Sequence, residues 1–238
     1  MMRPRVLVVV PCFNEAGAIG ALLAELQERA ACCDVLVVDD GSTDGTDRLV
    51  LPPARCVRLP ANLGIGGAVQ TGLQFAERAG YDYCIQIDGD GQHPPDLVHA
   101  LVQEAIQSAS QLVIGSRYLG ARDGFQSTAM RRIGSALIGR TLHLCFGGNR
   151  ITDPTSGLRV MDRKAIALFA RHYPTDYPEP VSIAWLLAKG LRVREIPVRM
   201  RERQAGVSSI RLMKTVSYMV RVLSYVLLAR ITDLPSDA

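Results

Sequence analysis

The sequence lacks the features that mark several common classes of protein. It contains no run of about 18 apolar residues, so no transmembrane helix is predicted. The first apolar run soon reaches acidic and turn residues, so no signal peptide is expected. None of the six cysteines forms a Cys-x-x-Cys pair, and most lie in apolar runs, where a free thiol acts as a small hydrophobic group. This pattern predicts a reducing, cytoplasmic location.

Two signatures of nucleotide-binding folds are also missing. Residues 11–15, PCFNE, close the first predicted strand, where a dinucleotide-binding fold would carry GxGxxG. Residues 62–67, NLGIGG, are rich in glycine, but Val69 stands at the last glycine position of that motif. No Gly-Lys-Ser/Thr of a P-loop is present there either. A Rossmann dehydrogenase and a P-loop kinase are therefore not favoured.

The chain carries little net charge for its length. A formal net charge of +4 over 238 residues is too small to predict a nucleic-acid partner. The positive charge is nevertheless concentrated in the last fifth of the chain, at Arg192, Arg194, Arg199, Arg201, Arg203 and Arg211. A basic patch beside an apolar C-terminal segment suits a phosphate group or an anionic membrane surface.

The first half of the chain shows a regular alternation of strand and helix patterns. Short apolar segments predict strands at residues 5–10, 34–38, 55–59, 83–87 and 112–115. Helical patterns lie between them at residues 16–31, 44–51, 64–79 and 95–108. The alternation predicts one α/β domain whose mostly parallel central sheet is covered by helices on both faces. Ligands on such sheets bind outside the carboxyl ends of the strands.

The second half is less regular. Helices are predicted at residues 128–145, 163–170 and 180–189, with strands within 149–160 and at 191–197. The last element, residues 210–233, is mostly apolar, is interrupted by four cations and has no acidic residue before Asp233. Two interpretations stay open for it. It is either a core or homodimer helix, or a helix that lies on the membrane with its cations at the head groups.

Two aspartates stand at the end of the fourth predicted strand, in the sequence IDGDG. Asp88 and Asp90 are two residues apart and so point to the same side of an extended chain. Neighbouring carboxylates repel each other unless a cation lies between them. Mg²⁺ takes one or two carboxylates together with phosphate oxygens, and Gln92 offers a further neutral oxygen. The alternative is a solvated turn, in which Asp-Gly is common.

A second aspartate pair, Asp39 and Asp40, ends the second predicted strand. Aspartate and serine are also good helix N-caps, which is the alternative interpretation of this segment. A cap accounts for one of these residues but not for two aspartates at the end of a buried strand. A carboxylate at this place is a candidate acceptor for ribose hydroxyls or a base N–H.

Five segments, in this order and spacing, resemble the family 2 glycosyltransferases with the GT-A fold: VVVPCFNE, VLVVDDGSTDGT, NLGIGGAVQTG, IQIDGDGQHPPD and GSRY. The resemblance covers roughly residues 4–210 and points to the dolichyl- or polyprenyl-phosphate mannose and glucose synthases. It implies a catalytic domain at 1–209, with a nucleotide-sugar half at about 1–115 and an acceptor half at about 116–209. The element at 210–238 then meets the membrane surface, a membrane protein or a second copy of the chain.

The resemblance also implies a reaction. The chain would transfer a sugar, with inversion, from a GDP- or UDP-linked donor to a polyprenyl or dolichyl phosphate, using Mg²⁺ or Mn²⁺. It would act as a peripheral protein at the cytoplasmic face of the membrane. Extension of a polysaccharide or glycolipid at a sugar hydroxyl is the alternative. A nucleotidyltransferase or a non-catalytic sugar-nucleotide binder is less favoured.

Individual positions take roles from the resemblance. The nucleotide pocket would comprise Pro11, Asn14, Glu15, Asp39, Asp40, Gly41, Asn62, Gly64, Asp88 and Gly89. The metal would be held by Asp88, Asp90 and Gln92, with Asp90 counted among the catalytic residues. The acceptor phosphate would be held by Arg117, Arg131, Arg132 and Ser135. A basic loop over the sugar diphosphate would include Arg201, Arg203, Ser208 and Ser209, with Arg203 acting in catalysis.

Family members that transfer a sugar to a hydroxyl need a carboxylate base. Asp176 and Glu179 are the candidates in the segment YPTDYPEPVSIAWLL, whereas Val181 stands where a second acid is expected. A phosphate acceptor is already anionic and needs no strong base. The pattern therefore favours a lipid-phosphate acceptor and leaves Asp176 and Glu179 as bases toward a sugar hydroxyl.

Overall fold

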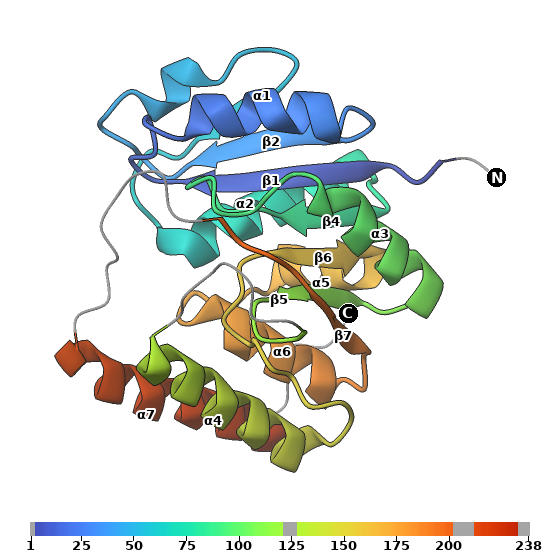
Figure 1. Cartoon of the computed structure of the whole chain (residues 1–238), viewed down its shortest axis with the longest axis vertical. Coiled ribbons are helices and arrows are strands. Elements are labelled where there is room, and N and C mark those ends of the chain that lie inside the picture. Colours follow the sequence, from blue (N-terminus) through green and yellow to red (C-terminus); the bar gives the residue numbers. More distant parts are fainter. Residues whose placement is uncertain (1–2, 121–127, 202–211, 233–238) are drawn as a thin grey trace.

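The computed structural model describes residues 3–120, 128–201 and 212–232, and its centre is a seven-stranded sheet (Figure 1). The strand order across the sheet is β3-β2-β1-β4-β6-β5-β7. The strands are β1 Val6–Cys12, β2 Asp34–Asp39, β3 Arg55–Arg58, β4 Tyr83–Gln86, β5 Leu112–Ser116, β6 Arg159–Asp162 and β7 Val193–Pro197. Every pair is parallel except those of β6, which runs antiparallel to β4 and β5. The predicted α/β fold with a mostly parallel sheet is confirmed.

Helices cover both faces of this sheet, as predicted. They are α1 Ile19–Arg29, α2 Gly64–Ala79, α3 Leu97–Ser108, α4 Ala129–Phe146, α5 Arg163–Arg171, α6 Pro178–Ala188 and α7 Leu212–Ile231. Val8 and Val10 of β1 pack with α1 and α3 on one face, while Leu7 and Val9 pack with α2, α5 and α6 on the other. The uniform apolar character of β1 therefore reflects burial on both faces of the sheet.

Several predicted helices differ from the structure in their bounds, and for two of them the local sequence gives the reason. Residues 44–51 contain only the 3₁₀ turn η1, Thr46–Leu49. Asp44 accepts a hydrogen bond from Thr46 N–H at 3.0 Å, and such local side-chain bonds compete with helix formation. Helix α6 begins at Pro178, two residues earlier than predicted, directly after Tyr177 with its φ of 51°. Proline suits this first helical position because no hydrogen bond from its nitrogen is needed there.

Helices α4 and α7 lie side by side and run parallel (Figure 1). A Cβ atom added at Gly134 would lie 3.3 Å from the Met219 sulfur, and Arg230 Nε donates to the Cys145 carbonyl at 2.9 Å. One face of α7 is buried through Val222, Val226 and Ala229, which belong to the core on the α2 side of the sheet. In the described part of the chain, no helix combines the length and apolar character that crossing a membrane requires.

Candidate functional site

The carboxyl ends of β1, β2 and β4 lie next to one another in the sheet, and a cavity of about 390 Å³ opens there. We call it the sugar-donor cavity, after the ligand that the sequence resemblance implies for it. It is lined by Pro11, Cys12, Phe13, Glu15, Asp40, Asn62, Gly64, Ile65, Ala68, Asp88, Gly89 and Asp90. Segments far apart in the sequence thus meet at one edge of the sheet, as expected for a ligand site of a parallel sheet.

Asp88 and Asp90 both face the sugar-donor cavity. The Asp88 carboxylate is 36% exposed and lies 3.4 Å from His93 Nε2 and from Gln86 Nε2. Burial alone would raise the pKa of Asp88, but hydrogen bonding and charge from His93, together with Gln86 and Arg117, lower its pKa overall. Asp88 is therefore anionic at neutral pH.

This carboxylate pair fits a divalent cation that is shared with a diphosphate. Within residues 3–120, 128–201 and 212–232, no three His, Cys, Asp or Glu side chains gather as a metal-binding group. Mg²⁺ and similar hard cations often take only one or two protein carboxylates and complete their shell with phosphate oxygens and water. Gln92 lies beside the pair, where its backbone N–H donates to Asp90 Oδ1 at 3.1 Å and its Nε2 lies 3.4 Å from the Arg201 carbonyl.

Gly157 packs directly against Asp88 from the acceptor half of the chain. A Cβ atom at residue 157 would lie 2.6 Å from Asp88 Oδ1, 2.8 Å from its Cγ and closer still to Oδ2. Real Cβ atoms do not approach other heavy atoms so closely. Only glycine therefore leaves the Asp88 carboxylate in its present position.

The aspartates at the end of β2 organise the loops of the sugar-donor cavity. Asp40 Oδ1 accepts from Leu63 N–H at 2.7 Å, which ties β2 to the start of α2. Asp39 is fully buried, and its Oδ1 accepts from Ser42 N–H at 3.2 Å. Its Oδ2 has no hydrogen-bond partner and lies 3.6 Å from Arg58 Nε. This buried oxygen therefore has an ion-pair partner but no hydrogen bond, which leaves it able to accept one from a ligand.

Asn14 and Glu15 hold the loop that follows β2. Asn14 adopts a φ of 56°, its N–H donates to Ser42 Oγ at 2.9 Å, and its Oδ1 accepts from Thr43 N–H at 2.9 Å. Glu15 N–H donates to Thr46 Oγ1 at 3.0 Å. Gly41 has a φ of 75°, and a Cβ there would lie 3.1 Å from the Ala61 carbonyl carbon. The predicted nucleotide-binding residues thus lie together, although Asn14, Asp39 and Gly41 do not line the cavity itself.

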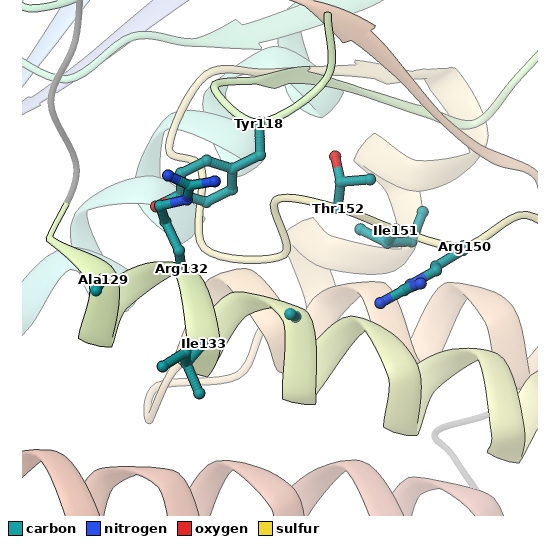
Figure 2. Close-up of a pocket in the computed structure, with 8 residues that line it drawn as sticks. Tyr118, Ala129, Arg132, Ile133, Arg150, Ile151 and Thr152 are labelled. Carbon is teal, nitrogen blue, oxygen red and sulfur yellow. The ribbon is translucent and has the colours of Figure 1, made fainter. Parts of the chain in front are cut away.

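A second cavity, of about 490 Å³, lies between α4 and the segment before β6 (Figure 2). We call it the arginine cavity. Figure 2 shows Arg132 and Tyr118 at one end and Arg150 at the other, with Ile151 and Thr152 between them. Its remaining lining residues are Ala129, Ile133 and Ala136. Two cations and an apolar wall suit a ligand that joins an anionic head to a hydrocarbon chain.

Three more residues expected at an acceptor phosphate do not line this cavity, although each is next in sequence to a residue that does. Arg117 forms a two-pronged ion pair with the buried Asp153, in which Nε–Oδ2 and Nη2–Oδ1 both measure 2.7 Å. Burial alone would lower the pKa of Arg117, but hydrogen bonding and charge from Asp153 raise its pKa overall. Ser135 is buried, and its Oγ lies 3.5 Å from Thr155 Oγ1. Arg131 is exposed on the first turn of α4.

The two candidate bases lie in different surroundings. Asp176 is exposed and lies 3.3 Å from the Tyr225 hydroxyl of α7. Burial raises the pKa of Glu179, while the Arg159 charge opposes this shift and the Asp88 charge adds to it.

Arg159 is buried and holds the acceptor half together. Its guanidinium donates to the carbonyls of Ser156 at 2.7 Å, Glu179 at 2.9 Å and Pro154 at 3.1 Å, and to Ser182 Oγ at 2.9 Å. These bonds join the turn before β6 to the first turn of α6. A buried cation of this kind is tolerated because its donors are satisfied.

The predicted diphosphate loop is only partly described. Arg201 contacts Glu25 through Nη1, at 2.8 and 2.7 Å from the two carboxylate oxygens, and its N–H donates to the Gln92 carbonyl at 2.9 Å. Arg203, Ser208 and Ser209 lie outside the described residues.

Sequence patterns missed three residues of the acceptor half: Arg150, Asp153 and Arg159. Asp153 and Arg159 both belong to DPTSGLR, a segment with a proline and a glycine between an aspartate and an arginine. That composition indicates an ordered turn and was the available signal. Nothing in the sequence distinguishes Arg150 from other exposed arginines.

Comparison with known proteins gives the family. The model of Glycosyl transferase family 2 matches residues 7–169. The chain is 32% identical to the undecaprenyl-phosphate mannosyltransferase of Micrococcus luteus, covering 87% of each chain. It is 28% identical to the polyprenol monophosphomannose synthase of Mycolicibacterium smegmatis, over 88% of this chain and 83% of that one. A solved structure of glucosyl-3-phosphoglycerate synthase from Mycobacterium tuberculosis superposes with a TM-score of 0.72 at 20% identity, over 97% of this chain and 80% of that one. The chain belongs to the family 2 glycosyltransferases and has their GT-A fold.

Proposed function

We propose that the chain transfers a sugar from a GDP- or UDP-linked donor to a polyprenyl or dolichyl phosphate, with inversion at the anomeric carbon. The arginine cavity carries this proposal, because it combines Arg132 and Arg150 with an apolar wall. Tyr118 lines the arginine cavity, and the charge of its neighbour Arg117 helps to lower the pKa of Asp88 in the sugar-donor cavity. Two relatives named above carry names of polyprenyl-phosphate mannose transfer, and a third, from Methanococcus voltae, is named for transfer of N-acetylglucosamine to dolichyl phosphate.

On the sugar-donor side, Asp88 and Asp90 would hold Mg²⁺ or Mn²⁺ together with the donor diphosphate. Such a metal neutralises the charge that develops on the departing nucleoside diphosphate. The Mycobacterium tuberculosis structure contains Mn²⁺ and UDP, which supports a divalent metal here. Asp39, whose Oδ2 has no hydrogen-bond partner, would accept a hydrogen bond from the nucleoside.

On the acceptor side, Arg132 and Arg150 would hold the phosphate, because a guanidinium donates two parallel hydrogen bonds to such a group. A phosphate oxygen attacks the anomeric carbon as the bond from that carbon to the diphosphate oxygen breaks on the opposite side. The attacking oxygen is already deprotonated, so no base has to remove a proton.

A shared outer face of α4 and α7 would place the enzyme on a membrane. Exposed apolar side chains on it are Met130, Ile133, Leu137 and Leu144 of α4 and Val220, Leu227, Leu228 and Ile231 of α7. Neither helix contains an acidic residue, while arginines lie at 131, 132, 140, 221 and 230. An apolar surface with cations and no acids suits an anionic bilayer. Ile133 also lines the arginine cavity, so the lipid acceptor would enter from this face.

A donor screen tests the function. Purified protein is incubated with GDP- and UDP-linked sugars and Mn²⁺ or Mg²⁺, and the release of nucleoside diphosphate is measured with polyprenyl phosphate or with the uncharged polyprenol. We expect release that needs both the metal and the phosphate group. Equal release with the polyprenol, or none with any donor and polyprenyl phosphate, would contradict the proposal.

Vesicle sedimentation tests the membrane face. Leu144→Glu and Leu227→Glu should each weaken binding to vesicles with anionic lipid by about tenfold. Each substitution puts a negative charge in place of exposed apolar area that the bilayer would bury. Leu51→Glu is the matched control, because Leu51 is exposed elsewhere on the molecule. Equal binding by the wild type and all three variants would contradict the membrane assignment.

Transfer to a sugar hydroxyl is the second candidate function, and Glu179 favours it. Burial raises the pKa of the Glu179 carboxyl, and a carboxyl with a raised pKa has the character of a general base. If the donor binds but lipid phosphate does not change its turnover, saccharide acceptors become the next test.

A further inference from the structure

Glu195 lies on the edge strand β7 and binds one short turn through three hydrogen bonds. Its Oε1 accepts from Asp153 N–H at 2.7 Å. Its Oε2 accepts from Thr152 N–H at 2.7 Å and from the Thr152 hydroxyl at 2.9 Å. Hydrogen bonds to an ionised acceptor are about twice as strong as neutral ones. Glu195 therefore fixes both the backbone of residues 152–153 and the rotamer of Thr152.

One route leads from this turn to Arg117. The Asp153 side chain is fully buried, and its Oδ2 accepts from the Arg117 backbone N–H at 3.0 Å and from Nε at 2.7 Å. Its Oδ1 accepts from Arg117 Nη2 at 2.7 Å. Because Glu195 holds the Asp153 backbone, it determines where this carboxylate stands and thereby how the Arg117 guanidinium is oriented.

A second route leads to Tyr118. The Thr152 hydroxyl donates its proton to Glu195, so the 2.7 Å contact between Ser116 Oγ and Thr152 Oγ1 has Ser116 as the donor. Ser116 Oγ in turn accepts from Tyr118 N–H at 3.3 Å. The direction of each bond in this chain follows from the Glu195 carboxylate, which can only accept. Glu195 thus anchors residues 116 and 118 on either side of Arg117.

We infer that Glu195 is a positioning residue for the acceptor side of the site. Glu195 is not a lining residue of either cavity, although it contacts Thr152, which lines the arginine cavity. It acts by fixing Arg117 and Tyr118. The inference rests on the proposed function in one respect, namely that these two residues meet the acceptor. The rigidity that Glu195 gives to the segment 115–119 does not depend on which acceptor is used.

Glu195→Gln tests this role. The amide has the same shape as the carboxylate, but its NH₂ group would face a backbone N–H that now donates to a carboxylate oxygen. Glu104→Gln is the matched control. Glu104 Oε1 lies 3.1 Å from Nε of Arg194, the neighbour of Glu195 on β7, and Glu104 does not reach the turn. In Glu195→Gln, hydrogen exchange of peptides covering 114–119 and 150–155 should be about tenfold faster, as expected for loss of one charged hydrogen bond. Peptides covering 85–92 should not change. Unchanged exchange at 114–119, or equal acceleration at 85–92, would overturn the inference.

Kinetics separates positioning from a general structural defect. The KM for the acceptor should rise about tenfold in Glu195→Gln, with the donor Kd and the far-ultraviolet circular dichroism unchanged. The double variant Glu195→Gln, Arg117→Ala should lose less than the sum of the two single losses, because one of the two routes from Glu195 acts through the Arg117 guanidinium. Additive losses would overturn the inference. Should Glu195→Gln not fold, Thr152→Val removes the second route alone and should still accelerate exchange at 114–119.

Failure of this inference and failure of the proposed function are distinguishable. A wild-type protein without lipid-phosphate activity would contradict the function, while the exchange experiment would still report on Glu195.

Discussion

The sugar-donor side and the acceptor side of the site are held in different ways. On the donor side, Asp39, Asp40, Asp88 and Asp90 follow directly from strand ends, and neighbouring loops close around them. On the acceptor side, the contacts join side chains that are far apart in sequence. Arg117 and Asp153 are 36 residues apart, and Glu195 and Thr152 are 43 apart. The donor-side aspartates are thus placed by the strands that they follow, while the acceptor side depends on a long-range ion pair and long-range hydrogen bonds.

The largest effect is expected for a substitution that disables the donor side alone. Asp90→Ala should lower kcat by about 10²–10³, the range seen when one preorganised electrostatic group is lost. Titration with Mn²⁺ should show weaker metal dependence in the variant. Asp96→Asn is the control, because Asp96 is exposed at the start of α3 and does not line the sugar-donor cavity. Full turnover by Asp90→Ala would remove the metal assignment.

The next effect breaks the acceptor side and leaves the donor side intact. Arg132→Ala and Arg150→Ala should each lower kcat/KM for a short-chain lipid phosphate by about tenfold, and the double variant by about a hundredfold, since charged hydrogen bonds are lost. Donor Kd should not change. Arg140→Ala on the same helix serves as the control, because Arg140 does not line the arginine cavity. If Arg140→Ala loses as much, the two arginines have no special role.

A smaller effect tests the contact where the two sides meet. Gly157→Ala should destabilise the protein by about 1–3 kcal/mol, because the added methyl group displaces the Asp88 carboxylate. Urea unfolding measures this loss. Gly20→Ala in α1 meets no atom within 4 Å and should be neutral or stabilising by up to about 1 kcal/mol. Equal stability of the two variants would show that Gly157 is not closely packed.

The smallest effect concerns Glu179, whose pKa burial raises in the folded protein. A carboxyl with a higher pKa when folded binds its proton more tightly in that state. Its stabilising contribution is therefore present below the unfolded pKa and is lost as pH rises through the folded pKa. The stability of the wild type should fall relative to Glu179→Gln as pH increases from about 4 to 8. Urea unfolding at several pH values measures the difference, and a difference that is constant with pH would contradict the shift.

The sequence predicted the donor side more completely than the acceptor side for a physical reason. A strand and the turn that follows it are contiguous, so an apolar run ending at Asp88 shows both the element and its ligand. Helix α2 was predicted with its observed bounds, Gly64–Ala79. In contrast, no periodicity links Arg117 to Asp153 or Thr152 to Glu195. These pairs depend on β6 running antiparallel to β5 and on β7 pairing with β5. Local sequence patterns do not encode either arrangement.

The parallel arrangement of α4 and α7 has an electrostatic consequence. Gly134 lies beside Met219, and Cys145 lies beside Arg230. The residues of each pair are 85 positions apart in the sequence, and the same offset brings the first turns of the two helices together. Each helix carries a partial positive charge at its N-terminus, so aligned parallel helices repel each other at that end. Ala129, Arg132 and Ile133, in the first turns of α4, line the arginine cavity. An anion bound there would lie near the N-terminus of α4, where the dipole of that helix favours it, and a bound acceptor phosphate would thus offset part of the repulsion within the helix pair.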